Sequence, residues 1–249
     1  MKTQTILAGL LASLALGFGP SAGAAITETF TPNNVTATST PNSAYILGNG
    51  PGLTEYITIS GAAFSSIAGV QVTLDLAGNG SWDGDYYAYL RGPNGGFAVL
   101  LDRIGVTADN SYGSSASGFN VTFSDTLPNS GDIHYATSVG GGPVTGTWQT
   151  DARVASPFSS GSDLAASARS DNLGTLNGFN PNGTWTLFVA DSPGDYGTLE
   201  SWGLAVSGNV AVVPESSTAF AGLMALAFTL LGPALRFSRV VGQGKKPLP

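Results

Sequence analysis

The chain has 249 residues, a formal net charge of −7 and no cysteine. This length allows one or two domains. The missing cysteines exclude thiolate nucleophiles, cysteine-ligated zinc and iron–sulfur clusters. The shortage of lysine and arginine argues against nucleic acid as a partner, because phosphate contacts require a basic surface.

The N-terminus has the three parts of a secretory signal peptide. Lys2 precedes the apolar run ILAGLLASLALGF, and small residues at Ala22, Gly23 and Ala24 then form an A-x-A cleavage box. Charge, apolar run and cleavage box in this order are typical of export signals. We expect residues 1–24 to be a signal peptide that is cut after Ala24. The alternative interpretation is a first core helix.

The region between the two ends shows strand patterns rather than helical periodicity. Apolar and polar residues alternate in four segments, at residues 70–76, 119–123, 185–189 and 202–206. Alternation with a period of two places one face of a strand on a core and the other in water. Clusters of Gly, Asn, Asp, Ser and Pro separate the segments and indicate turns. The pattern predicts an all-β domain, an antiparallel sandwich or barrel.

Residues 140–178 form the weakest part of this pattern, because they are rich in small and polar residues. We expect a long connection here, with a short strand near Gly146–Gln149 and a helical turn in the segment LAASARS. A connection of this length within a compact domain is usually functional or mobile. It is therefore the place where we expect a specific binding surface.

The closing segment, residues 173–208, carries the motifs of a known family. An Asn-Gly-Thr-Trp strand is followed by an Asp, by Gly-Asp-Tyr-Gly-Thr-Leu-Glu-Ser-Trp and by a last strand; the matching residues are Phe179, Asn182, Gly183, Thr184, Trp185, Leu187, Val189, Asp191, Gly194, Asp195, Gly197, Leu199, Trp202 and Leu204. Upstream, the segment GDYYAYLRGPNGG matches at Gly84, Asp85, Leu90, Pro93 and Gly95. Residues 54–208 thus resemble the proprotein-convertase P domain, also called Homo B.

This resemblance implies a jelly-roll-like antiparallel β-sandwich over residues 54–208, with residues 25–53 as an N-terminal lead-in. P domains commonly follow a subtilisin-like protease, and the short lead-in cannot hold one. The resemblance therefore implies that this domain could serve proteolysis only as an accessory module beside a separate serine endopeptidase.

The C-terminal tail also resembles a known family. Val213, Pro214 and Glu215 begin a short box in which Ser216 replaces the usual second proline. An apolar run at residues 219–235 follows, and then Arg236 and Arg239, with a short basic segment at 240–249. Residues 213–239 are similar to a PEP-CTERM sorting tail. The run is at the short limit for a transmembrane helix, and the charges after it indicate a cytoplasmic end.

The PEP-CTERM resemblance implies a bacterial protein that is exported to the cell envelope or extracellular matrix, at least transiently anchored in the membrane. It implies an exosortase-type membrane processing enzyme as a partner and exopolysaccharide as the setting. Two alternatives for the apolar run stay open, namely a permanent membrane anchor and a buried core helix.

The sequence offers little for catalysis. His134 is the one histidine, so a Ser-His-Asp triad would have to use it. There is no GxSxG elbow, and one histidine without cysteine cannot furnish the usual zinc ligands. We therefore predict no catalytic residues and expect His134 to be hydrogen-bonded to the backbone of a loop or strand end.

Aspartates in turns are the better candidates for a site. Asp83 and Asp85 lie in one turn, and Asp191 and Asp195 lie in another. Calcium takes six to eight oxygen ligands, which carboxylates and turn carbonyls can supply. The P-domain resemblance also implies a structural Ca²⁺ near these residues. The alternative is that the aspartates accept backbone N–H bonds within their turns.

Trp82, in a turn beside Asp83, is the aromatic residue that we expect to be exposed and able to contact a glycan. Taken together, the sequence predicts an exported, non-catalytic β-sandwich that serves as a binding or structural module. The alternatives are the accessory module of a protease and a carbohydrate-binding or glycan-active jelly roll.

Overall fold

The computed structural model describes residues 25–30, 44–47, 51–138, 140–192 and 196–209. The predicted signal peptide, its cleavage site at Ala22 and Ala24, and the predicted sorting tail lie outside these residues. Within them, no helix has the length and apolar character needed to cross a membrane.

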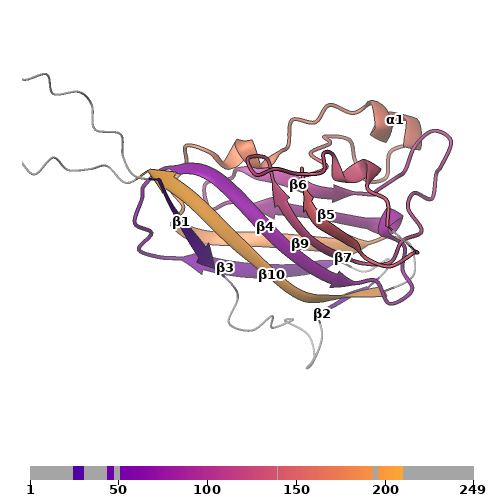
Figure 1. Ribbon diagram of the computed structural model, residues 1–249, viewed down its shortest axis with the longest axis horizontal. Coiled ribbons are helices and arrows are strands. Elements are labelled where there is room, and N and C mark those ends of the chain that lie inside the picture. Colours follow the sequence, from indigo (N-terminus) through magenta and orange to yellow (C-terminus); the bar gives the residue numbers. More distant parts are fainter. Residues whose placement is uncertain (1–24, 31–43, 48–50, 139, 193–195, 210–249) are drawn as a thin grey trace, which may run out of the picture. The chain divides into compact units, whose positions relative to one another are not determined.

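Two β-sheets make up the domain and lie one over the other (Figure 1). The first sheet has the order β1 (Ala25–Phe30), β10 (Tyr196–Asn209), β4 (Ile67–Ala77), β7 (Phe119–Ser124), β8 (Val144–Trp148), and β2 (Ala44–Leu47) also pairs with β10. The second has the order β3 (Leu53–Ile59), β9 (Gly183–Asp191), β5 (Tyr86–Arg91), β6 (Phe97–Asp102). The predicted all-β sandwich is confirmed.

The core lies between the sheets and follows the predicted alternation. In β4, Val70, Val72, Leu74 and Leu76 are buried, and the inward side chains of β7, β9 and β10 meet them in one apolar cluster. Trp185 is fully buried in this cluster. Each such side chain gains about 1.5–3 kcal/mol on leaving water, so the alternating strands account for the stability of the sandwich.

The first sheet differs from the antiparallel arrangement that the sequence predicted. β8 runs parallel to β7, pairing Phe119 with Val144 and Phe123 with Trp148. Parallel strands require a long crossover, and residues 125–143 provide it. The sheet is therefore mixed, whereas the second sheet is antiparallel throughout the described residues.

The lead-in segment also contributes to the first sheet. β1 pairs antiparallel with the C-terminal half of β10, and β2 pairs with its N-terminal part. β4 pairs with the other edge of β10. β10 therefore has strand neighbours on both of its edges.

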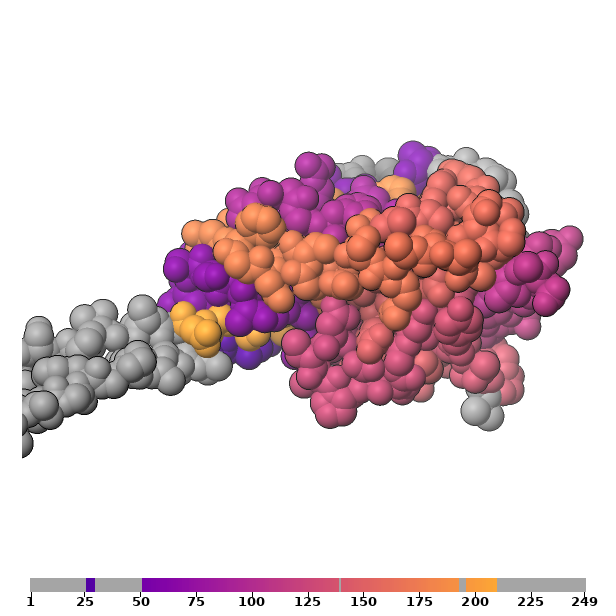
Figure 2. Space-filling view, turned by 90° about the horizontal axis from the view of Figure 1, so that it is seen from above, coloured from indigo at the N-terminus to yellow at the C-terminus, as the bar shows by residue number. Residues whose placement is uncertain are grey.

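The connection at 140–178 contains more structure than the sequence predicted. It holds β8, the short helix α1 (Gly161–Ala166) and a 3-10 turn at Leu173–Leu176. The helix begins earlier than expected because the Ser160 side chain accepts a hydrogen bond from the backbone N–H of Asp163. After β8, the connection, coloured salmon to orange, lies across the surface of the domain in Figure 2.

Candidate functional site

His134 is fully buried, and both of its ring nitrogens are engaged. It lies in a 3-10 turn at Ile133–Tyr135. Nδ1 is 2.9 Å from Oδ2 of Asp151, and Nε2 is 2.9 Å from the carbonyl oxygen of Val106. Both partners offer acceptor oxygens, which a ring protonated on both nitrogens satisfies. Burial lowers the pKa of His134, but the hydrogen bond and charge of Asp151 outweigh it and leave the pKa raised.

A buried ion-pair network continues from this pair. Nη1 of Arg153 lies 2.8 Å from Oδ1 of Asp151 and 3.1 Å from Oδ2 of Asp132. Nε of Arg169 lies 3.3 Å from the same Asp132 oxygen. Arg153 also donates from Nε to the carbonyl of Leu164 in α1, at 3.0 Å. The network therefore ties the histidine turn to the connection that follows β8.

Asp102, at the end of β6, is a further buried carboxyl group beside the network. Neither of its oxygens has a hydrogen-bond partner among the described residues. Burial, reinforced by the negative charge of Asp151, raises the pKa of Asp102 to about 7. The carboxyl group is therefore partly protonated at neutral pH.

Of the four predicted calcium ligands, the structure describes Asp83, Asp85 and Asp191, whereas Asp195 lies outside the described residues. Asp83 is buried, and its Oδ1 accepts from the backbone N–H of Gly118 at 2.7 Å. Asp191 is buried, and its Oδ2 accepts from the Ser81 hydroxyl at 2.6 Å.

These aspartates lie around one phenol. The pKa of Tyr86 is raised by burial and further by the charges of Asp191, Asp83 and Asp85. The turns at 81–85 and 191 therefore come together, as the calcium hypothesis requires.

The fit to a cation is incomplete within the described residues. Oδ2 of Asp83 is buried there without a partner, which suits an oxygen-preferring ion. However, the same residues contain no group of three or more His, Cys, Asp or Glu side chains arranged to hold a metal. Calcium binding therefore stays a prediction, with Asp83 and Asp191 as the residues that would hold the ion.

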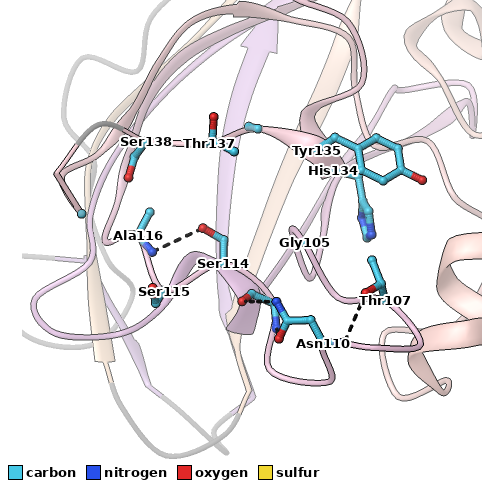
Figure 3. A pocket seen from close by; sticks show the side chains of 13 residues that line it. Gly105, Thr107, Asn110, Ser114, Ser115, Ala116, His134, Tyr135, Thr137 and Ser138 are labelled. Atoms are coloured by element: carbon cyan, nitrogen blue, oxygen red, sulfur yellow. Dashed lines mark hydrogen bonds between the residues drawn. The ribbon is translucent and has the colours of Figure 1, made fainter.

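A pocket of about 470 Å³ opens between the segments 105–116 and 134–141. Figure 3 shows its wall, which is made mainly of small polar side chains and backbone, including Thr107, Asn110, Ser114, Thr137 and Ser138. His134 contributes to this wall, but its side chain has no exposed surface. The pocket therefore offers hydroxyl, amide and peptide groups rather than an acid or base.

Trp82 is 43% exposed, and its ring packs edge-on against Tyr112, with the ring centroids 6.4 Å apart. The backbone N–H of Asp83 donates to the carbonyl of Ala116 at 2.8 Å. The turn that carries Trp82 is therefore held against a segment of the pocket wall.

Sequence reasoning missed the ion-pair network and the pocket. Both join residues that are far apart in the chain, and no local pattern distinguishes Asp151 or Arg153 from solvated charges. The one available signal was the scarcity of cations, since two of the few arginines, Arg153 and Arg169, lie in one short segment.

Comparisons with known proteins identify no family. No family model matches the chain, and no curated protein matches it. Among solved structures, the serine protease of Aeromonas sobria in complex with its chaperone (ORF2) is 15% identical, with a TM-score of 0.41, over 76% of this chain and 28% of that chain. The same protease in a separate crystal structure is 14% identical, with a TM-score of 0.40, over 75% and 27%. Structural similarity this weak identifies neither a family nor an activity for this chain.

Proposed function

We propose that this chain is an exported, non-catalytic β-sandwich that acts as a binding or structural module at a bacterial cell surface or in the extracellular matrix. The observation that supports the absence of catalysis is that both ring nitrogens of His134 are engaged by other groups of the protein. A general base must present a free ring nitrogen to its nucleophile. Here one nitrogen bonds to Asp151 and the other to Val106, at 2.9 Å each.

The sequence supports the location. The signal at residues 1–24 favours export, and the tail at 213–239 favours processing by an exosortase-type enzyme. We further propose that the sandwich is jelly-roll-like, in the manner of a P domain, on the motifs of residues 173–208.

The intact mass of the native protein, measured separately in membrane and extracellular fractions, tests this proposal. We expect an extracellular chain that begins at Ala25 and ends near Val213–Ser217. A chain that retains Leu235 and the terminal lysines would instead be a permanently anchored display domain. A chain that retains residues 1–24 in the cytoplasmic fraction would overturn the proposal.

The second candidate, an accessory module for a subtilisin-type endopeptidase, is favoured by the same P-domain motifs. Under either reading, the purified protein has no peptidase activity of its own. We therefore expect no cleavage of casein. Cleavage that a serine-directed inhibitor abolishes, and that His134→Ala also abolishes in a variant with an unchanged circular dichroism spectrum, would contradict the non-catalytic assignment.

A further inference from the structure

Three exposed aromatic side chains lie on three separate loops of this domain. Trp82 is 43% exposed, Tyr112 is 72% exposed and Phe158 is 84% exposed. Scattered apolar side chains are common on protein surfaces, but a cluster of large exposed ones marks a binding site. Whether these three form a cluster depends on what holds their loops together.

One arginine holds all three loops. The guanidinium of Arg103 donates from Nε to the carbonyl of Gly84 at 3.3 Å, from Nη2 to Ser111 at 3.1 Å and from Nη1 to Pro157 at 3.4 Å. Each acceptor lies within two residues of one of the exposed aromatics. Arg103 itself adopts a left-handed backbone conformation, with φ at 53°, which is uncommon for a residue other than glycine.

This arrangement fixes the aromatic loops before any ligand arrives. A planar guanidinium presents its donors in a rigid fork, so three carbonyls bound to it keep a set geometry. Preorganised groups lose less entropy on binding. The Trp82 and Tyr112 rings are in addition in edge-on contact.

The aromatic loops border the polar pocket. The backbone N–H of Gly84 donates to the carbonyl of Ser114, a pocket residue, at 3.0 Å. Tyr112 lies in the chain between the pocket residues Asn110 and Gly113. The Asn110 side chain donates to the Gly113 carbonyl at 2.8 Å and accepts from its N–H at 3.1 Å, which fixes the turn that presents Tyr112. A fourth aromatic, Tyr135, belongs to the pocket wall and is 59% exposed.

The chemistry of the lining selects among ligands. Within the described part of the chain, the pocket wall contains no Lys, Arg, Asp or Glu, and the ring of His134 is turned to Asp151 and Val106. A phosphate or other anion would therefore find no counter-charge. A lipid chain would find hydroxyls and peptide groups where it requires apolar contacts. A neutral ligand with many hydroxyl groups and one apolar face matches both the wall and the aromatic rim.

We propose that the pocket and its rim bind a neutral oligosaccharide, with one sugar unit hydrogen-bonded in the pocket and a neighbouring unit stacked on Tyr112 and Trp82. This proposal names the ligand class of the binding module proposed above and rests on that function. Arg103 is a positioning residue in it, since its donors are used by the three loops.

The test is isothermal titration calorimetry of the full-length protein with neutral homo-oligosaccharides of glucose, mannose, galactose, xylose and N-acetylglucosamine. We expect at least one of them to bind. Tyr112→Ala should weaken that binding by about tenfold, which corresponds to the loss of one aromatic stack. Tyr112→Phe should retain it. Tyr56→Ala, which removes a comparably exposed tyrosine (55%) from β3, is the matched control and should leave binding unchanged.

Three outcomes would overturn the proposal. The first is that the wild-type protein binds none of these saccharides, and the second is that Tyr112→Ala and Tyr56→Ala have equal effects. The third is that the wild-type protein binds phosphatidylglycerol vesicles and that Tyr112→Ala abolishes this binding but not the binding of a saccharide. That result would assign the aromatic rim to a lipid surface.

Each saccharide that binds is also assayed for release of new reducing ends. Release would keep the binding site but overturn the non-catalytic function. Failure of binding together with a processed extracellular chain would keep the proposed function and remove only the ligand assignment.

Discussion

Asp102 lies in an environment that its position at the end of a strand does not suggest. It ends a β-strand with both carboxyl oxygens buried, and its pKa is raised to about 7 by burial and then by Asp151. The folded state therefore keeps a proton between pH 4 and 7 that the unfolded chain releases. Stability falls as pH rises through this range, because the folded state binds more protons.

This argument predicts a decline in stability with rising pH that substitution of Asp102 reduces. Each pH unit in which only the folded state is protonated changes the free energy of unfolding by at most about 1.4 kcal/mol. We expect Asp102→Asn to flatten the decline between pH 5 and 7 and to raise stability at pH 8. Burial raises the pKa of Asp83 to about 7 as well, and the pKa of His134 is raised by Asp151, so part of the decline should remain in the variant. Urea unfolding at pH 5, 7 and 8 measures this, and an unchanged slope in the variant would exclude Asp102 as the source.

Arg153 is the central cation of the buried network, since it bonds to both Asp151 and Asp132. Removing one partner of a buried ion pair leaves uncompensated charge and costs about 3–5 kcal/mol. We expect Arg153→Met to lower the free energy of unfolding by that order. Arg91→Met, at an exposed position on β5, should change it by less than about 0.5 kcal/mol. Equal effects in chemical denaturation would show that the network contributes nothing.

At the scale of elements, the segment after β8 is part of the core. Leu164, in α1, and Leu173 and Leu176, in the 3-10 turn, are buried. A helix of six residues is too short to be stable alone, so packing holds it. Arg153 binds the carbonyl of Leu164 and joins the network to the same helix.

Truncation of the Leu164 side chain tests whether the segment after β8 is part of the core. We expect Leu164→Ala to cost about 2–5 kcal/mol, because it removes a buried side chain and leaves a cavity. Leu127→Ala, at a position that is 40% exposed, should cost clearly less. Thermal unfolding compares the two. If the loss at Leu164 were no larger than at Leu127, the connection would be an independent surface loop.

At the scale of the whole molecule, the hydrogen bond from Ser81 to Asp191 joins the turn at Asp83–Asp85 to the end of β9, across 110 residues of the chain. A Ca²⁺ held at Asp83 and Asp191 would stabilise the folded state by mass action, by about 2.7 kcal/mol at one hundred times its Kd. We therefore expect EDTA to lower the Tm and Ca²⁺ to restore it.

Asp83→Asn should abolish that calcium response, whereas Asp109→Asn, at an exposed position, should keep it. Differential scanning calorimetry of the full-length protein in EDTA and in Ca²⁺ provides the measurement. A Tm that is the same in both solutions would remove calcium from the account of this fold.

The sequence by itself determined the strands and their buried faces. Alternation at residues 70–76 and 185–189 is a local property, and each apolar side chain on one face contributes independently to burial. The export and sorting assignments are local in the same sense and remain sequence predictions.

Only the tertiary structure decided the polar arrangement. His134 meets Asp151 and Val106, and Arg103 meets three separate loops, because the two sheets bring distant segments together. The parallel direction of β8 likewise depends on where residues 125–143 return the chain. Hydrogen bonds and ion pairs are directional contacts between specific atoms, so composition and periodicity carry no signal for them.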